Sequence, residues 1–193
     1  MSPATTIDAT DAPRLILAAA DRLFYERGIA AVGMDDIRDS AGVSLRRLYG
    51  LYPSKRELVA AWLDDRHDRW MHWFTTAIER RSADGVDPLL ATFDALVEWA
   101  ESPGYRGCAF LNAIAETTEI DDAHRAIVAA HKRALIDHLA GLATQSSPLG
   151  PTWLAGAIGV LVDGAIVQSA VFGTTQPILD ARSAATRLLE ALQ

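Results

Sequence analysis

The sequence contains a single cysteine, Cys108, and so lacks the thiol pairs that an internal disulfide or a multi-cysteine metal site requires. Its first residues form neither a basic segment nor an apolar one, so we expect no secretory signal. Its longest apolar run, Trp153–Val162, is interrupted by glycines and closed by Asp163, which makes it too short to cross a bilayer. These absences predict a soluble protein of the reducing cytoplasm, without a membrane partner.

The motifs of common enzyme classes are absent as well. The sequence has no G-x-S-x-G, no phosphate-binding P-loop, no G-x-G-x-x-G and no H-E-x-x-H. Cys108 has no surrounding motif that would mark a nucleophile. We therefore expect a protein that is not an enzyme, with no catalytic residue, cofactor or metal site.

Charge is unevenly distributed along the chain. The formal net charge is -7, which by itself disfavours binding to a polyanion. Residues 1–60, however, hold eight acidic and eight basic side chains, so the remainder carries the whole negative excess. Within this neutral part, Ser44–Arg56 has four cations and no acid. Because local charge decides which face meets phosphate, this segment is the candidate DNA-binding surface.

Strand patterns are missing, whereas helix start and stop signals recur throughout the chain. They predict an all-α fold of about nine helices, with a first domain over residues 1–58 and a second over 59–193. The expected helices cover residues 12–27, 34–41, 45–49, 54–81, 88–101, 107–118, 121–144, 152–171 and 177–192.

The segment Ile37–Leu58 shows the pattern of a helix-turn-helix. Two short helices are joined by Ala41-Gly42-Val43, where Gly42 permits a tight turn. The spacing of Ile37, Val43 and Leu48 predicts the small core between the two helices. The same pattern also fits a plain helical hairpin with no role in DNA binding.

The second helix of this motif carries the candidate DNA contacts. Its N-terminal end presents Leu45, Arg46 and Arg47, where side chains can reach base edges, and arginine suits guanine as a bidentate donor. The flanking residues Ser44, Tyr49 and Lys55 are suited to phosphate contacts.

From Leu15 to Leu63, the sequence resembles the N-terminal domain of the TetR family of transcriptional regulators. The resemblance rests on an ordered set of positions: Ala19, Leu23-Phe24, Gly28, Asp36-Ile37, Ala41–Ser44, Leu48-Tyr49, Tyr52–Lys55 and Leu58. It implies that residues between Ser44 and Leu48 read bases. It also implies contacts with the DNA backbone from four positions, which are Ser44, Tyr49, Tyr52 and Lys55.

Two features depart from the family pattern. Gly33 stands where a capping threonine or serine is common, at a cost of only a few tenths of a kcal/mol. Arg46 stands where a small residue is common and is followed by Arg47, which points to an unusual operator.

The family resemblance implies that a three-helix head is followed by a six-helix body, which binds a small-molecule effector and forms a homodimer through its last two helices. Gly156, Gly159 and Gly164 would allow another helix to approach closely. Candidate effector contacts are aromatic or polar side chains of the middle helices: Trp70, Trp73, Phe93, Phe110, Asn112 and Glu116. Each of these also fits a role in the core.

Three histidines, His124, His131 and His138, recur every seventh residue of one expected helix. They lie roughly 10 Å apart along the axis and so cannot share a metal ion. We expect a stripe facing solvent or an interface.

The sequence thus predicts a ligand-responsive transcriptional regulator, a repressor that a small molecule releases from a near-palindromic operator on double-stranded DNA. The alternative is a helical small-molecule-binding protein or enzyme that has lost DNA binding. The four cations of Ser44–Arg56 favour the first hypothesis.

Overall fold

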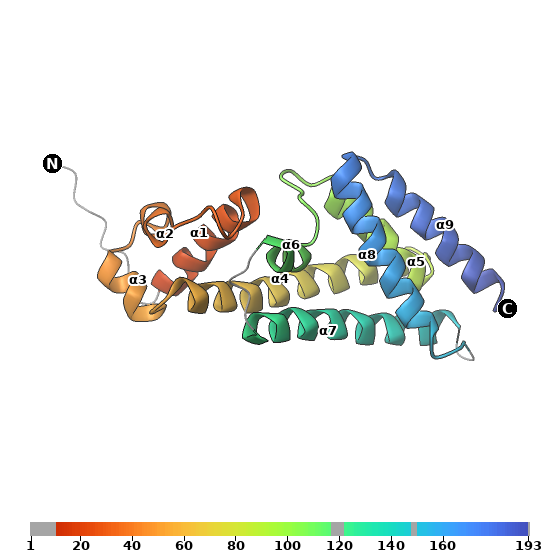
Figure 1. Cartoon of the computed structure of the whole chain (residues 1–193). Helices are drawn as coiled ribbons and strands as arrows, with labels where there is room; N and C mark the ends of the chain where they lie inside the picture. The colour runs from red at the N-terminus through yellow and green to blue at the C-terminus, as the bar shows by residue number, and fades with distance from the viewer. Residues whose placement is uncertain (1–10, 117–121, 148–149, 193) are drawn as a thin grey trace. The chain divides into compact units, whose positions relative to one another are not determined.

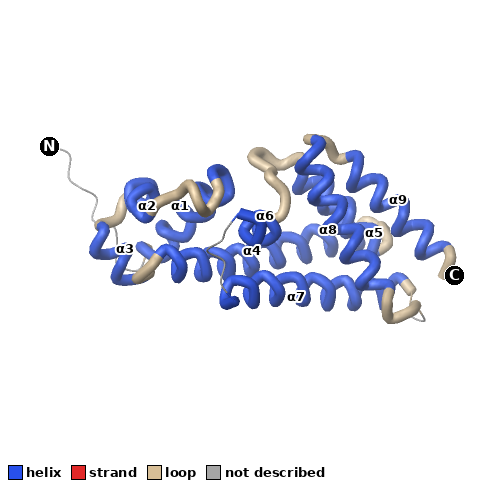
Figure 2. Tube along the Cα trace, in the orientation of Figure 1, coloured by secondary structure: helices blue, strands red, loops and turns tan. Residues whose placement is uncertain are grey.

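The computed structural model describes residues 11–116, 122–147 and 150–192. Over these ranges the chain forms nine α-helices and no strand, as the sequence predicts (Figures 1 and 2). The helices are α1 (Ala12–Arg27), α2 (Met34–Ala41), α3 (Leu45–Leu51), α4 (Lys55–Ala83), α5 (Pro88–Ala100), α6 (Ala109–Glu116), α7 (Asp122–Ser146), α8 (Leu154–Phe172) and α9 (Gln176–Glu190).

Most helix ends follow from local capping groups. The Ser54 hydroxyl accepts the N–H of Glu57 at 3.2 Å at the start of α4, and the Asp87 carboxylate accepts the N–H groups of Leu89 and Leu90 at 2.9 and 3.2 Å at the start of α5. α3 continues to Leu51, two residues beyond the predicted end. The predicted cap of α7, Asp121, lies outside the described residues.

The chain divides into two compact units. One comprises the described residues up to His67 together with those of Ala109–Val128, and the other comprises Asp68–Cys108 with the described residues from Ala129 onward. α6 and the start of α7 therefore group with the N-terminal helices, although they lie far beyond them in the sequence. The predicted functional division at residue 58 stays a prediction.

In the first unit, a polar cluster joins α1 to α4. The Asp21 carboxylate on α1 accepts hydrogen bonds from Trp62 Nε1 at 2.8 Å and from Arg66 Nη1 at 2.6 Å. The Arg66 guanidinium also lies 4.0 Å from the centre of the Tyr25 ring, a cation–π contact. Around this cluster, Ile16, Phe24 and Trp62 are buried, with apolar contact between the two aromatic rings.

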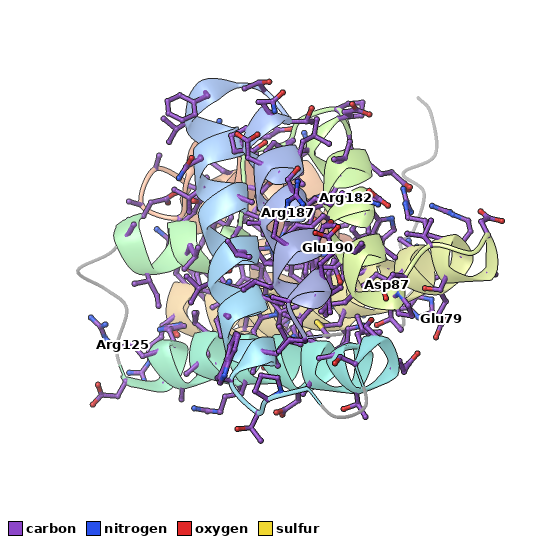
Figure 3. The ribbon with its side chains drawn as sticks, turned by 90° about the vertical axis from the view of Figure 1, so that its right-hand side faces the viewer. Glu79, Asp87, Arg125, Arg182, Arg187 and Glu190 are labelled. Atoms are coloured by element: carbon purple, nitrogen blue, oxygen red, sulfur yellow. The ribbon has the colours of Figure 1, made fainter. Side chains whose placement is uncertain are left out.

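In the second unit, α8 and α9 run side by side and both pack on α5 (Figure 1). Ile158 and Val162 of α8 and Ile178 of α9 are fully buried. Arg182 of α9, labelled in Figure 3, donates to the Asp94 carboxylate of α5 at 2.7 Å, which adds an ion pair to the apolar contact.

α8 is long and apolar enough to cross a membrane by length and composition. The sequence-based estimate of a run too short to span was therefore wrong, because it stopped at Asp163 while the helix continues to Phe172. Within the most apolar window, 44% of the residues are buried in the chain itself, and Asp163 forms an ion pair with Lys132. α8 therefore packs partly against the rest of the second unit and carries a charged residue along its length.

The contact between α1 and α4 gives a stability prediction. Arg66→Ala should lower the free energy of unfolding by about 2 kcal/mol, because it leaves the mostly buried Asp21 carboxylate without its charged partner. Arg14→Ala is the control: its ion pair with Asp11 is exposed and should contribute about 0–1 kcal/mol. Urea unfolding followed by circular dichroism measures both, and equal losses would contradict a special role for Arg66.

Candidate nucleic-acid interface

The turn between α2 and α3 depends on Gly42. Its backbone is left-handed, with φ 67° and ψ 25°, and its N–H donates to the carbonyl oxygen of Arg38. A side chain at this position would be strained, so glycine here ends α2 and redirects the chain. Ile37 and Leu48 are buried between the helices as the sequence predicts, whereas Val43 is half-buried.

The first turns of both helices are capped. Ser44 Oγ accepts the N–H of Arg47 at 3.2 Å, which fixes the start of α3. Gly33 precedes α2 as predicted, and the Asp36 carboxylate accepts its N–H at 2.8 Å. This hydrogen bond, aided by the charge of Arg27, holds the pKa of Asp36 below its usual range. The helix therefore starts properly without a capping hydroxyl.

The outward face of α3 brings the predicted base-contacting residues together. Leu45 and Arg46 are exposed, Arg47 is partly exposed, and Tyr49 lies one turn after Leu45 with 43% of its surface accessible. Leu48 is the fully buried residue of this helix. Arg46 lies about 200° around the axis from Leu48, at about 100° per residue, and so points directly away from the core.

Several cations of this unit differ in whether they have a partner within the chain. Four arginines that support the fold are each paired with at least one carboxylate: Arg14 with Asp11, Arg27 with Asp36, Arg38 with Asp35 and Asp39, and Arg66 with Asp21. Within the described parts of the chain, by contrast, the side chains of Arg46, Arg47 and Lys55 form no hydrogen bond or ion pair. The local excess of positive charge therefore lies on α3 and the first turn of α4.

Tyr52 and Lys55 complete the predicted set of backbone contacts. Tyr52 directly follows α3, where its N–H donates to the Leu48 carbonyl oxygen at 2.8 Å. Its ring is half-buried, and burial together with the negative charge of Asp65 raises the pKa of its hydroxyl. Tyr52 thus stays a neutral hydrogen-bond donor beside the free Lys55 ammonium.

The six residues predicted to bind an effector are divided between the units. Phe110, Asn112 and Glu116 belong to α6 in the first unit, and the other three belong to the second. Phe93 and Phe110 are 0% and 2% exposed, as core residues are. The exposed Glu116 carboxylate accepts the N–H of Ile29, just after α1, at 2.7 Å. The assignment of these six residues to an effector site stays a prediction.

Trp70 lies at the centre of an aromatic cluster in the second unit. Its ring stacks on Phe74 at 4.6 Å and meets Trp99 and His131 edge-on at 5.6 and 5.5 Å. The buried Trp70 Nε1 and Thr92 Oγ1 have no hydrogen-bond partner among the described residues. Two polar atoms of this kind, inside apolar surroundings, are unusual in a native core.

The prediction that three histidines form an exposed stripe was wrong. His124 and His131 are each 3% exposed, and His138 is half-buried. His124 Nε2 donates to the carbonyl oxygen of Arg56 at 3.0 Å, while His131 and His138 contact the rings of Trp70 and Phe74. The seven-residue spacing correctly placed them on one face, but that face is covered by other helices.

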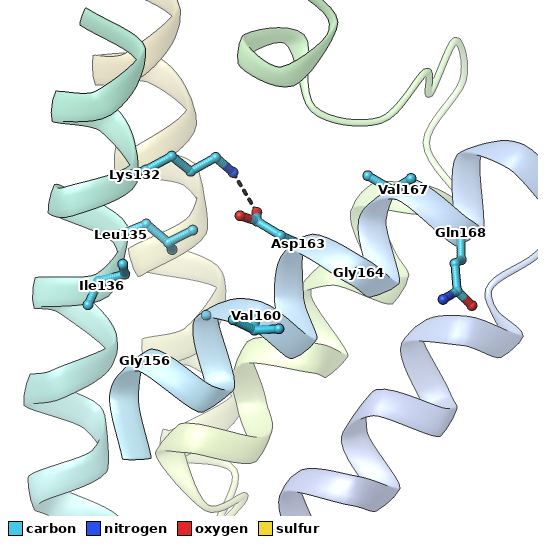
Figure 4. Close-up of a pocket in the computed structure, with 10 residues that line it drawn as sticks. Lys132, Leu135, Ile136, Gly156, Val160, Asp163, Gly164, Val167 and Gln168 are labelled. Carbon is cyan, nitrogen blue, oxygen red and sulfur yellow. Dashed lines mark hydrogen bonds and ion pairs between the residues drawn. The ribbon is translucent and has the colours of Figure 1, made fainter. Parts of the chain in front are cut away.

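A groove of about 470 Å³ lies between α7 and α8 in the second unit (Figure 4). Its floor is opened by the small residues Gly156 and Gly164 of α8, where an added Cβ would meet nothing within 4 Å. Lys132 of α7 donates to Asp163 of α8 at 2.5 Å on its wall. The predicted effector residues are absent from this groove.

The exposed side of α8 is apolar as well, with Val160, Val171 and Phe172 exposed to 73%, 72% and 66%. α9 differs, since its outward side carries polar residues such as Arg187 and Glu190, labelled in Figure 3, and its Leu189 is buried in the chain's own core.

Known proteins with similar sequences are transcriptional regulators. Residues 16–62 match a family model described as "Bacterial regulatory proteins, tetR family". The transcriptional regulator TtgR of Pseudomonas putida is 39% identical over 85 residues, which are 44% of this chain and 39% of TtgR. The transcriptional activator FasR of Mycolicibacterium smegmatis is 39% identical over 93 residues, covering 47% and 42% of the two chains. The chain therefore spans about two fifths of these curated relatives.

Solved structures match over nearly the whole chain. A TetR-family transcriptional regulator from Streptomyces coelicolor superposes with a TM-score of 0.82 and 30% identity, covering 100% of this chain and 96% of that one. A putative regulator of the same kind from Streptomyces avermitilis gives a TM-score of 0.77 with 25% identity, covering 93% and 96%.

His138 gives a pH prediction. Burial lowers its pKa below the ordinary value of 6.5, and the charge of Glu79 opposes that shift only in part. Below pH 6.5 the unfolded chain therefore binds a proton that the folded chain resists, so stability should fall as pH drops from 7 toward 5. His138→Gln should flatten that part of the profile of unfolding free energy against pH. An unchanged slope would show that other groups dominate it.

Proposed function

This chain belongs to the TetR family of bacterial transcriptional regulators, and on that premise we propose that α3 is the recognition helix that reads a near-palindromic operator. α3 would lie in the major groove, with Leu45, Arg46 and Arg47 facing base edges. Ser44, Tyr49, Tyr52 and Lys55 would contact the phosphates on either side.

The observation that carries this proposal is the set of cations without partners. Arg27, Arg38 and Arg66 of the first unit are paired with carboxylates, whereas Arg46, Arg47 and Lys55 find no partner among the described residues. Exposed side chains of one charge on a seven-residue helix repel each other mildly and do not help the fold. An anionic partner outside the chain would pair with these cations. Because they lie on the second helix of a helix-turn-helix, we infer that this partner is DNA.

A homodimer is part of the proposal, because a near-palindrome requires two heads. The exposed side of α8 carries Val160, Val167 and Val171, and an apolar helix face of this kind favours contact with a partner. The adjacent groove at Gly156 and Gly164 would let an apolar ridge from a second copy approach closely. In this arrangement α8 contributes the apolar centre of the interface, and α9 adds a polar rim.

Control by a small molecule and repression complete the proposal, and the cytoplasm is the expected location. Trp70 Nε1, whose ring stacks on Phe74, and Thr92 Oγ1 have no partner among the described residues, which favours a planar aromatic effector that carries a hydrogen-bond acceptor. Glu116 and His124 reach backbone groups at the end of α1 and in the first turn of α4. Through these hydrogen bonds, a shift of α6 or of the start of α7 would displace the N-terminal helices.

DNA binding is tested by separating base contacts from phosphate contacts. Arg46→Ala should cost about 1–3 kcal/mol on the selected operator and relax preference at one position in each half-site. Lys55→Ala should weaken binding to all duplexes and lower the dependence of log K on log salt by about one. Fluorescence anisotropy at several salt concentrations, on operator and random duplexes, measures both effects.

Arg80→Ala is the matched control, because it removes one exposed cation from the last turn of α4, in the second unit. It should leave affinity and salt dependence unchanged. A wild-type chain that binds no duplex in this assay would instead support a helical small-molecule-binding protein without DNA binding. Equal losses from Arg46→Ala on operator and random DNA would reassign Arg46 to phosphate.

The dimer interface is tested at Gly164. Gly164→Arg should place a bulky charge in the apolar groove and give a monomer, with reduced operator affinity because one head contacts only half a site. The space around Gly164 lets the folded subunit accept a side chain, as circular dichroism should confirm. Gly141→Arg, at an open position on α7, is the control and should remain dimeric in light scattering. A folded, dimeric Gly164→Arg variant would place the interface elsewhere.

A further inference from the structure

Gly50 is a helical glycine for which the described structure offers no internal reason. It lies in α3, two residues after the buried Leu48, and it is exposed. Glycine weakens a helix because it gains more freedom on unfolding and buries no side chain. Gly50 is the sixth of the seven residues of α3, and even near the end of so short a helix a glycine supports the helical backbone less than an alanine would.

The usual structural reasons for glycine do not apply here. The backbone at Gly50 is helical, and it is not among the positive-φ glycines such as Gly42. A Cβ built at Gly50 would meet nothing within 4 Å. By contrast, a Cβ at Gly159 would lie 3.4 Å from Ile136, so that glycine serves the packing of α8 on α7. Nothing in the described part of the chain, then, excludes a side chain at position 50.

The position of Gly50 on the helix indicates which partner outside the chain would exclude a side chain there. Gly50 lies one turn after Arg46, and residues four apart in a helix share a face. That face points away from Leu48 and carries Arg46, whose side chain has no partner among the residues that the structure describes. Tyr49 and Leu51, on either side of Gly50 in the sequence, are both exposed large side chains. Gly50 is therefore a gap in the surface of α3, bordered by larger side chains.

We propose that Gly50 is a specificity-determining residue, whose missing side chain lets α3 approach the base edges on the floor of the major groove. This inference rests on the proposed role of α3 in DNA recognition. The major groove is about 12 Å wide, and a helix with its side chains is about 10–12 Å across, so a helix fits with little room to spare. A glycine on the face that carries Arg46 lets the helix backbone lie closer to one base pair. The Arg46 side chain can then extend directly to its guanine.

The proposal separates two modes of binding. On random DNA the protein is held by phosphate contacts at the edges of the groove, and no close approach to the bases is needed. On the operator, α3 must sit deeply enough for base contacts. A methyl group at position 50 should therefore weaken operator binding much more than binding to random duplexes, although it should strengthen the helix itself.

The test uses the full chain and duplexes that it selects from a random-sequence pool, long enough for two half-sites about 10 base pairs apart. Gly50→Ala should lower affinity for the selected operator about tenfold, comparable to the loss of one good base contact, at fixed salt. Affinity for random duplexes and the salt dependence should stay unchanged, and the melting temperature should stay equal or rise. Gly50→Leu should lower operator affinity further.

Gly141→Ala is the matched control, because Gly141 is also helical and exposed, with no atom within 4 Å of an added Cβ. It should change neither operator binding nor specificity. A second selection with Gly50→Ala should recover operators that differ at one position in each half-site.

The outcomes distinguish this inference from the proposed function. A wild-type chain that recovers no duplex overturns both. A wild type that recovers an operator, while Gly50→Ala binds it equally well, overturns only the role of Gly50. Equal weakening on operator and random DNA also overturns it, because that result would indicate a general disturbance of the head rather than lost access to bases.

Discussion

The position of α3, the helix that we propose reads DNA, depends on one carboxylate, that of Asp21. It accepts hydrogen bonds from Trp62 and Arg66 of α4 and thereby holds α1 against that helix. Because α2 and α3 pack on α1, this contact also fixes the two helices of the turn. The Arg66 guanidinium lies over the Tyr25 ring and has little access to water, so it needs this carboxylate. The geometry of the head thus depends on a mostly buried ionic contact in addition to apolar packing.

In the first unit, acidic residues pair with several arginines, whereas the cations of α3 have no partner among the described residues. Carboxylates on α1 and α2 neutralise the arginines that brace the fold, and the cations of α3 remain available. The residues beyond position 60 carry the whole net charge of -7. A phosphate backbone is therefore attracted to one face and not to the chain in general, which limits unproductive binding of DNA elsewhere on the surface.

Helix positions could be predicted from sequence because their determinants are local. Gly42, Ser44, the Ser54–Glu57 pair and Asp87 act within a few residues of themselves, and each does in the structure what its position in the sequence predicts. Contacts between distant segments could not be predicted in this way. The bond between Trp62 and Asp21 joins residues 41 apart, and no spacing rule identifies such a partner.

The histidines of α7 show the same limit, since a repeat of seven gives a shared face but not what covers it. The sequence could not decide whether an aromatic residue belongs to the core or to an effector site, because its pattern does not show what surrounds the ring. Only the structure shows that Phe93 is in the core, while the buried indole N–H of Trp70 has no partner within the described ranges of the chain.

The exposed residues of α3 can change without disturbing the fold, which affects how regulators of this kind diverge in the DNA that they bind. Leu45, Arg46, Tyr49 and Gly50 contribute little to the core, whereas Gly42 and Leu48 are required by the turn and the packing. Surface substitutions away from packed or capped positions usually change stability by less than about 0.5 kcal/mol. After gene duplication, a copy could therefore acquire a new set of target genes through changes at these four positions, with its fold intact at every step.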